Sequence, residues 1–158
     1  MSYRKTLVFV VIMLSVACST NQDTSEPPAE LQAFEEKIEI QRVWRASVGG
    51  SSERLRLGLA PATDGARIYA GSNGGQAAAF DAETGVRIWS VQTNLQLSAG
   101  PAYGNDVLAF GTSDGDLLVL DANTGEEIWR RGVGSEVLAP PAISNNILAL
   151  RSVDGRLR

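Results

Sequence analysis

Two carboxylates that recur in a repeated motif are the first candidates for chemistry. The stretch DAETGVRIW begins at Asp81 and DANTGEEIW begins at Asp121, an offset of 40 residues (121 − 81). Paired carboxylates can bind a cation or act as general acid and base. Each aspartate, however, precedes a turn glycine, Gly85 or Gly125, and aspartate in such a turn accepts hydrogen bonds from nearby backbone N–H groups. We therefore predict that these residues form turns and hold neither a metal nor a catalytic site.

Three tryptophans suggest a second kind of chemistry, the stacking of a flat cofactor. Trp89 and Trp129 end the two copies of the motif, and Trp44 precedes them. A large aromatic residue at the end of every outer strand is better explained by packing between neighbouring units, with its indole N–H donating to a backbone carbonyl. We predict that all three are buried structural residues and that no cofactor is bound.

The composition argues against most enzyme sites. The sequence has no histidine, which removes Ser/His/Asp and Cys/His mechanisms and every metal site that uses histidine. Its one cysteine, Cys18, allows neither an internal disulfide nor a cysteine-rich metal cluster. With 14 Lys and Arg against 18 Asp and Glu, the sequence shows no basic face for nucleic acid. We expect a protein that is not an enzyme and does not bind nucleic acid.

Residues 1–17 have the order of parts that an export signal requires. A basic pair, Arg4 and Lys5, is followed by an apolar run from Leu7 to Leu14 and then by small residues. A transmembrane helix is the alternative, but a span needs about 20 apolar residues and this run is much shorter. The pattern predicts a signal peptide.

The stretch LSVAC before the cysteine resembles a bacterial lipoprotein signal. The resemblance implies cleavage before Cys18 and lipidation of that residue, although Ser15 stands where such signals usually have leucine. Ser19 resembles lipoproteins sent to the outer membrane. Residues 18–37, polar and with two prolines, cannot form a core and are predicted to be a lipid-anchored tether.

Residues 38–158 are predicted to form the elements that position these motifs. Pro61, Pro101 and Pro141 mark three units at 40-residue intervals, and Asn/Asp-Gly turns separate short apolar runs within each unit. This period indicates four-stranded propeller blades, with the outer strand ending on tryptophan. The predicted fold is all-β, with antiparallel four-stranded blades of a truncated β-propeller and extended structure from about Ile38.

The DAxTGxxxW ending of each unit resembles the quinoprotein-type β-propeller repeat. Together with the lipoprotein signal, the tether and Trp44, the chain from about Val43 to Arg158 is similar to the N-terminal part of the propeller lipoproteins of the outer-membrane β-barrel assembly machinery. The resemblance implies about two and a half of eight blades, and a strand around Trp44 would complete the last blade if the remaining blades existed.

The same resemblance implies a function and a location. A non-catalytic scaffold would lie on the periplasmic face of the outer membrane, held by its lipid, and aid the folding and insertion of outer-membrane proteins. Its partners would be the central subunit of the assembly complex and unfolded outer-membrane proteins paired to strand edges. In the family the contacts to the central subunit lie in later blades, so no partner-binding residue is predicted in this sequence.

The alternative is part of a quinone-cofactor (PQQ-type) propeller dehydrogenase. Such an enzyme would need a calcium site, a catalytic aspartate and, in many cases, a vicinal cysteine pair. The pair is absent, and Asp64, Asp106 and Asp154 all fall in predicted turns. We therefore favour the scaffold.

Overall fold

The computed structural model describes residues 29–30, 38–50 and 57–158 of the chain. The chain divides into two compact parts, Met1–Glu39 and Ile40–Arg158. Every strand of the described residues lies in the second part. Cys18 and most of the predicted tether lie outside the described residues. Within the described part there is no helix long and apolar enough to cross a membrane.

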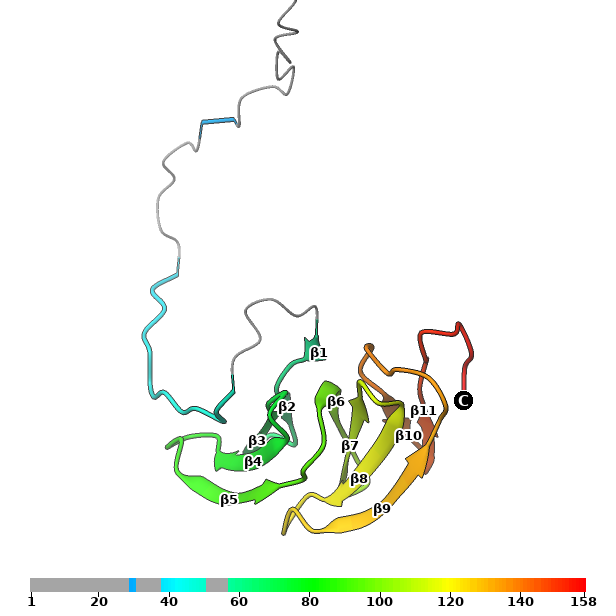
Figure 1. Cartoon of the computed structure of the whole chain (residues 1–158). Helices are drawn as coiled ribbons and strands as arrows, with labels where there is room; N and C mark the ends of the chain where they lie inside the picture. Colours follow the sequence, from blue (N-terminus) through cyan, green and yellow to red (C-terminus); the bar gives the residue numbers. More distant parts are fainter. Residues whose placement is uncertain (1–28, 31–37, 51–56) are drawn as a thin grey trace, which may run out of the picture. The chain divides into compact units, whose positions relative to one another are not determined.

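The part from Ile40 to Arg158 consists of successive antiparallel sheets (Figure 1). The first sheet has the order β2-β3-β4-β5 and contains β2 (Ala62–Thr63), β3 (Arg67–Gly71), β4 (Gln76–Asp81) and β5 (Arg87–Gln92). The second contains β6 (Leu97–Gly104), β7 (Val107–Thr112), β8 (Asp116–Asp121) and β9 (Glu127–Gly132). The predicted all-β fold of four-stranded antiparallel units is confirmed.

A third unit begins after the second sheet. It contains the hairpin of β10 (Ala142–Ser144) and β11 (Ile147–Ala149), followed by a bridge between Arg151 and Leu157. The short strand β1 (Gly58–Leu59) pairs in parallel with β6 and extends the second sheet at its inner edge. This parallel pair was not predicted, because the sequence shows only a short apolar run there.

The outer strands differ from the prediction that they end on tryptophan. In β5, Trp89 pairs with Ala79, and the ladder continues to the pair of Gln92 with Gln76. In β9, Trp129 pairs with Val119, and the ladder also continues beyond it. The strands run on because the partner strands β4 and β8 still offer backbone groups for pairing.

The strand expected around Trp44 is absent. Residues 38–50 contain no strand, and the sheets of the described residues contain no strand before β1. A strand needs a neighbouring strand to pair its backbone N–H and C=O groups, and no strand of the described residues pairs with this segment. Trp44 donates a hydrogen bond to the Ala82 carbonyl, and the Ser47 carbonyl accepts one from Arg87 of β5.

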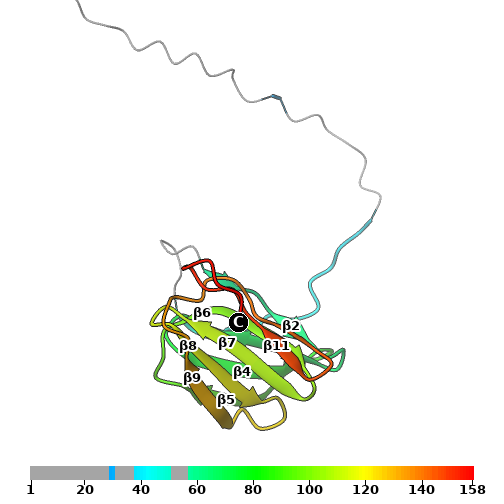
Figure 2. The ribbon, with the colours of Figure 1, turned by 90° about the vertical axis from the view of Figure 1, so that its right-hand side faces the viewer.

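Two hydrophobic clusters lie between the successive sheets, which Figure 2 shows one behind another. Burial of apolar faces between sheets about 10 Å apart is the usual core of such layered β-proteins. The first cluster joins the first and second sheets through Tyr69, Ala77, Ala79, Leu97, Leu108, Phe110, Leu118, Leu120 and Ala122. The second joins the second sheet to the third unit through Ala99, Ala109, Leu117, Val119, Val137 and Leu150.

Candidate functional site

The repeated Asp-Ala-x-Thr-Gly turn uses its aspartate within the turn itself. Asp81 Oδ1 accepts hydrogen bonds from the Thr84 backbone N–H at 2.8 Å and from the Thr84 hydroxyl at 2.7 Å. The turn closes where the Gly85 N–H donates to the Asp81 carbonyl, with a glycine φ of 71°. The hydrogen bond from the Thr84 hydroxyl is the largest cause of a lowered pKa of Asp81, and the bond from the Thr84 N–H lowers it further.

The second copy of the turn has the same geometry. Asp121 Oδ1 accepts from the backbone N–H groups of Asn123 at 2.8 Å and Thr124 at 2.9 Å, and Gly125 has a φ of 79°. The bond from the Thr124 N–H is the main cause of the lowered pKa of Asp121. Both carboxylates are thus engaged by their own turns, and neither points to a shared site.

The first of these turns receives a tryptophan from upstream in the chain. The Trp44 indole N–H donates to the Ala82 carbonyl at 2.9 Å. A Cβ atom on Gly85 would lie 2.6 Å from the Trp44 ring, which is closer than non-bonded carbon atoms approach. The indole therefore fits only because position 85 has no side chain.

The second turn repeats this contact one unit later. The Trp89 indole N–H donates to the Ala122 carbonyl at 3.0 Å, and a Cβ atom on Gly125 would lie 2.7 Å from the Trp89 ring. A tryptophan from the outer strand of one unit thus docks on the glycine turn of the next. The glycine has a second role that we had not predicted; the signal for it in the sequence was that the glycine and the tryptophan both recur in each copy of the motif.

Trp129 is in a different state from the other two tryptophans. It is 41% exposed, so the expectation that it is buried is wrong; Trp44 and Trp89 are only partly buried. No glycine turn among the described residues lies against the Trp129 indole, in contrast to Gly85 beside Trp44 and Gly125 beside Trp89.

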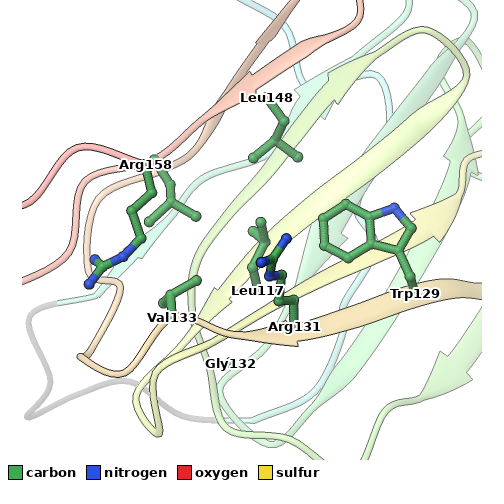
Figure 3. A pocket seen from close by; sticks show the side chains of 8 residues that line it. Leu117, Trp129, Arg131, Gly132, Val133, Leu148 and Arg158 are labelled. Atoms are coloured by element: carbon green, nitrogen blue, oxygen red, sulfur yellow. The ribbon is translucent and has the colours of Figure 1, made fainter.

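The exposed tryptophan lines a groove between β9 and the third unit (Figure 3). The groove has a volume of about 540 Å³. Leu117 of β8 and Leu148 of β11 contribute apolar side chains to it, and Arg131 and Arg158 contribute guanidinium groups. The lining residues are Leu117, Trp129, Arg131, Gly132, Val133, Leu148, Leu150 and Arg158.

A polar cluster adds a second contact between the first two repeat units, which contain β2–β5 and β6–β9. The Arg67 guanidinium donates to Asn123 Oδ1 at 2.9 Å and to the Ala122 carbonyl at 3.3 Å. Tyr69 donates its hydroxyl to Asp64 Oδ2 at 2.8 Å, and its ring stacks on Tyr103 with centroids 5.5 Å apart.

The titration behaviour of this cluster follows from its contacts. Burial, and then the hydrogen bond to Asp64, raises the pKa of Tyr69. For Asp64, burial acts to raise the pKa, but the hydrogen bonds from the Tyr69 hydroxyl and from backbone N–H groups outweigh it and leave the pKa below its usual value. These groups stabilise the interface between units.

The remaining aspartates considered for catalysis also lie in connections between strands. Asp106 accepts a hydrogen bond from the Tyr103 hydroxyl at 3.3 Å. Asp154 is bonded by Ser152 and pairs with Arg158 at 3.2 Å; the bond from Ser152 is the largest cause of a pKa lowered to about 2. Within the described residues, no group of three or more Asp, Glu or Cys side chains could hold a metal ion.

The free edges of the outer strands are a further candidate surface. β5 and β9 each lie at the end of their sheet and have one edge without a neighbouring strand among the described residues. Ile88 and Ile128, at equivalent places in these strands, are 49% and 50% exposed. An unpaired strand edge beside exposed aliphatic residues can accept another extended chain.

Comparison with known proteins identifies the family. The sequence profile described as outer membrane protein assembly factor BamB matches residues 29–96 and 75–158. The protein of that name from Pseudomonas aeruginosa is 36% identical over 87 residues, which are 55% of this chain and 23% of that protein. The one from Alkalilimnicola ehrlichii is 38% identical over 95 residues, 60% of this chain and 24% of that protein.

Solved structures show the same fold. BamB from Moraxella catarrhalis superposes with a TM-score of 0.57 at 24% identity, over 66% of this chain and 31% of that one. The quinohemoprotein alcohol dehydrogenase from Comamonas testosteroni gives a TM-score of 0.50 at 22% identity, over 57% of this chain and 16% of that one. The chain spans about a quarter of the length of the curated relatives it matches. On the match of the family profile to most of its length, the chain belongs to the family of the outer membrane protein assembly factor BamB.

Proposed function

We propose that this chain acts as a non-catalytic scaffold in the assembly of outer-membrane β-barrel proteins, aiding their folding and insertion. The observation that carries the proposal is the match of the BamB family profile over residues 29–96 and 75–158. The geometry supports it, because the side chains considered for catalysis or cofactor binding make structural contacts instead. The repeated aspartates bind their own turns, and Trp44 and Trp89 dock on glycines.

A propeller dehydrogenase is the second candidate, because the fold is shared with quinohemoprotein alcohol dehydrogenases. Fold likeness alone does not carry function, since enzymes and scaffolds use the same architecture. The docked tryptophans argue against it in this part of the chain. An indole that lies on a turn glycine and donates its N–H to a carbonyl does not offer that face to a cofactor.

We propose further that the protein is anchored by lipid at Cys18 to the periplasmic face of the outer membrane, with residues 18–37 as the tether. The support is the order of basic pair, apolar run and LSVAC in the sequence. One acyl chain gives only marginal membrane binding, whereas the three chains of a mature lipoprotein give stable attachment.

The proposed partners are the central subunit of the assembly complex and unfolded outer-membrane proteins. For the second kind of partner, the free edges of β5 and β9 supply unpaired backbone groups. Ile88 and Ile128 beside them supply exposed aliphatic contacts. An extended segment from an unfolded barrel protein has the complementary backbone groups and alternating apolar side chains.

Deletion of the gene that encodes this chain tests the function. In the source organism, the loss should lower the amount of folded outer-membrane barrel proteins, measured by their heat-modifiable migration in gels. The variant Cys18→Ser, expressed from the same locus, is the matched control for anchoring. Unchanged barrel proteins together with the loss of a quinone-dependent dehydrogenase activity in the cell envelope would favour the enzyme instead.

A further inference from the structure

The turn between β3 and β4 contains the one asparagine of this sequence that is followed by glycine. Asn73 precedes Gly74, whereas the equivalent positions in the next two units hold Ser113 and Val153. The carboxamide carbon of an asparagine can be attacked by the backbone nitrogen of the next residue, and a glycine there places no Cβ atom beside that nitrogen. The first unit therefore carries a reactive pair that the repeat itself does not require.

The attacking atom of this pair, the Gly74 nitrogen, is accessible. Gly74 is exposed, and no group among the described residues accepts a hydrogen bond from its N–H. Its carbonyl, by contrast, accepts a hydrogen bond from Gln92 Nε2 at 2.7 Å, and the Gly75 carbonyl accepts one from the Thr93 N–H at 2.9 Å. The turn is thus held through its carbonyl groups, and the nitrogen that would react stays open to water.

The carboxamide of Asn73 is held in place by a contact to the second unit. Its Nδ2 donates a hydrogen bond to the carbonyl of Leu97, the first residue of β6, at 3.0 Å. This bond engages the nitrogen that would depart, not the carbon that would be attacked. Asn73 is only partly buried and lines a hollow of about 320 Å³. A reacting group restrained beside its nucleophile and reached by water has little entropy left to lose on reaction.

We propose that Asn73 is a site of spontaneous deamidation. The Gly74 nitrogen loses its proton to water or hydroxide and forms a bond to the side-chain carbon of Asn73. The bond from that carbon to Nδ2 breaks, and the nitrogen takes up a proton and leaves as ammonia, so that a cyclic imide remains. Water then opens the imide at either carbonyl and gives aspartate or isoaspartate. The net change is amide plus water to carboxylic acid plus ammonia, with no oxidant or reductant.

The modification weakens the joint between the first two units, whatever partner the protein serves. An ionised carboxylate is an acceptor only, so it would face the Leu97 carbonyl, another acceptor, where the amide of Asn73 now donates. Isoaspartate also adds a carbon to the backbone of the turn. That turn is closed by a hydrogen bond of 2.9 Å from the Gly75 N–H to the Ser72 carbonyl, whose geometry the added carbon disturbs.

The test follows deamidation in the folded, whole protein at mildly alkaline pH. Trypsin releases residues 68–87 as one peptide, in which Asn73 is the only asparagine. It releases residues 88–130 as another, which contains Asn94, Asn105 and Asn123 as internal references. The gain in mass from amide to acid, and methylation by an isoaspartyl methyltransferase, report the products.

Two sets of variants separate the chemistry from its effect. Gly74→Ala is the control for the reaction, because an added Cβ atom would meet only Ser72 Oγ, at 3.8 Å, and should leave the turn intact. Asn73→Asp carries the product at this position. Asn73→Ser is its matched control, since it also loses the amide donor, adds no charge and has the residue that the second unit holds at the equivalent place.

We expect the peptide of residues 68–87 to react at least about tenfold faster than its reference, and Gly74→Ala to remove this excess, because such intramolecular steps are steeply sensitive to crowding of the attacking atom. Asn73→Asp should lower the midpoint of thermal unfolding by about 4 °C more than Asn73→Ser, the scale of one good contact in a domain of this size.

Two results would overturn the proposed site: an Asn73 that reacts only after the protein is unfolded in urea, or equal rates in the parent and Gly74→Ala proteins. Equal unfolding midpoints of Asn73→Asp and Asn73→Ser would overturn the effect on the joint between the units.

Discussion

The indole of Trp89 lies against Gly125 of the next unit and donates its N–H to the Ala122 carbonyl at 3.0 Å. Trp44 makes the equivalent contact with Gly85 and Ala82, with an N–H to O distance of 2.9 Å. The contact therefore recurs at successive units of the chain. The Trp89 contact ties the outer strand β5 to the turn that opens the outer strand β9, whereas Trp44 comes from a segment without a strand.

Truncation of a docked tryptophan should destabilise the protein far more than truncation of the undocked one. Trp89→Ala removes an aromatic packed against the first cluster and a hydrogen bond, and should lower the free energy of unfolding by about 3 kcal/mol. Trp129→Ala is the matched control, because it has the same residue type at the same repeat position but is 41% exposed. Chemical denaturation of both variants measures the difference. Equal losses would contradict the docking account.

Acid should weaken the glycine turns. The pKa of Asp121 is lowered in the folded protein from 3.8, mainly by the hydrogen bond from the Thr124 N–H. A depressed folded pKa means that the stabilisation is present above pH 3.8 and is lost as the pH falls through the lower folded value. The Asp121→Asn variant has no carboxylate to titrate, so its melting temperature should fall less between pH 6 and pH 3. An equal fall in parent and variant would exclude this contribution.

Cys18→Ser should abolish lipid attachment. If Cys18 is the mature N-terminus, metabolic labelling with a fatty acid should mark the parent and not the variant, and the variant should leave the membrane fraction. Ser19→Ala, one residue away, is the control and should keep the label. The lipoprotein prediction would be contradicted if the parent protein carried no label and the variant stayed in the membrane fraction through its apolar run.

The repeat spacing was sufficient to predict the sheets. Strands on both sides of each Asn/Asp-Gly turn follow from local chemistry, because those residues accept the backbone geometry of tight turns. The hydrogen bonds of the Asp81 and Asp121 carboxylates are likewise local, within three residues along the chain. These features depend on neighbours in sequence, which a single sequence displays.

Features that depend on distant partners were predicted less well. The strand expected at Trp44 is absent, and no strand of the described residues pairs with that segment. Trp129 is exposed because burial of its indole requires a glycine turn from a neighbouring unit, which its own motif does not supply. The second role of Gly85 and Gly125, as the floor under an indole, needs two units to be seen together.

A double-mutant cycle on Trp89 and Gly125 tests the central claim, that the first unit is joined to the second by a tryptophan docked on a glycine. A non-glycine residue in the left-handed conformation costs about 1–2 kcal/mol. Gly125→Ala alone should lower the free energy of unfolding by more than this, because the added Cβ meets the Trp89 ring. Gly134→Ala is the control, since Gly134 has a φ of 75° and no atom within 4 Å of an added Cβ.

In the Trp89→Ala background the clash is gone, so Gly125→Ala should then cost no more than Gly134→Ala. Denaturant unfolding of the four variants of the cycle gives the coupling energy directly. The account predicts that the double variant loses less free energy of unfolding than the sum of the two single losses. The difference should be at least about 1 kcal/mol, as for residues in contact. Additive losses would show that the indole does not rest on this glycine, and would contradict the account.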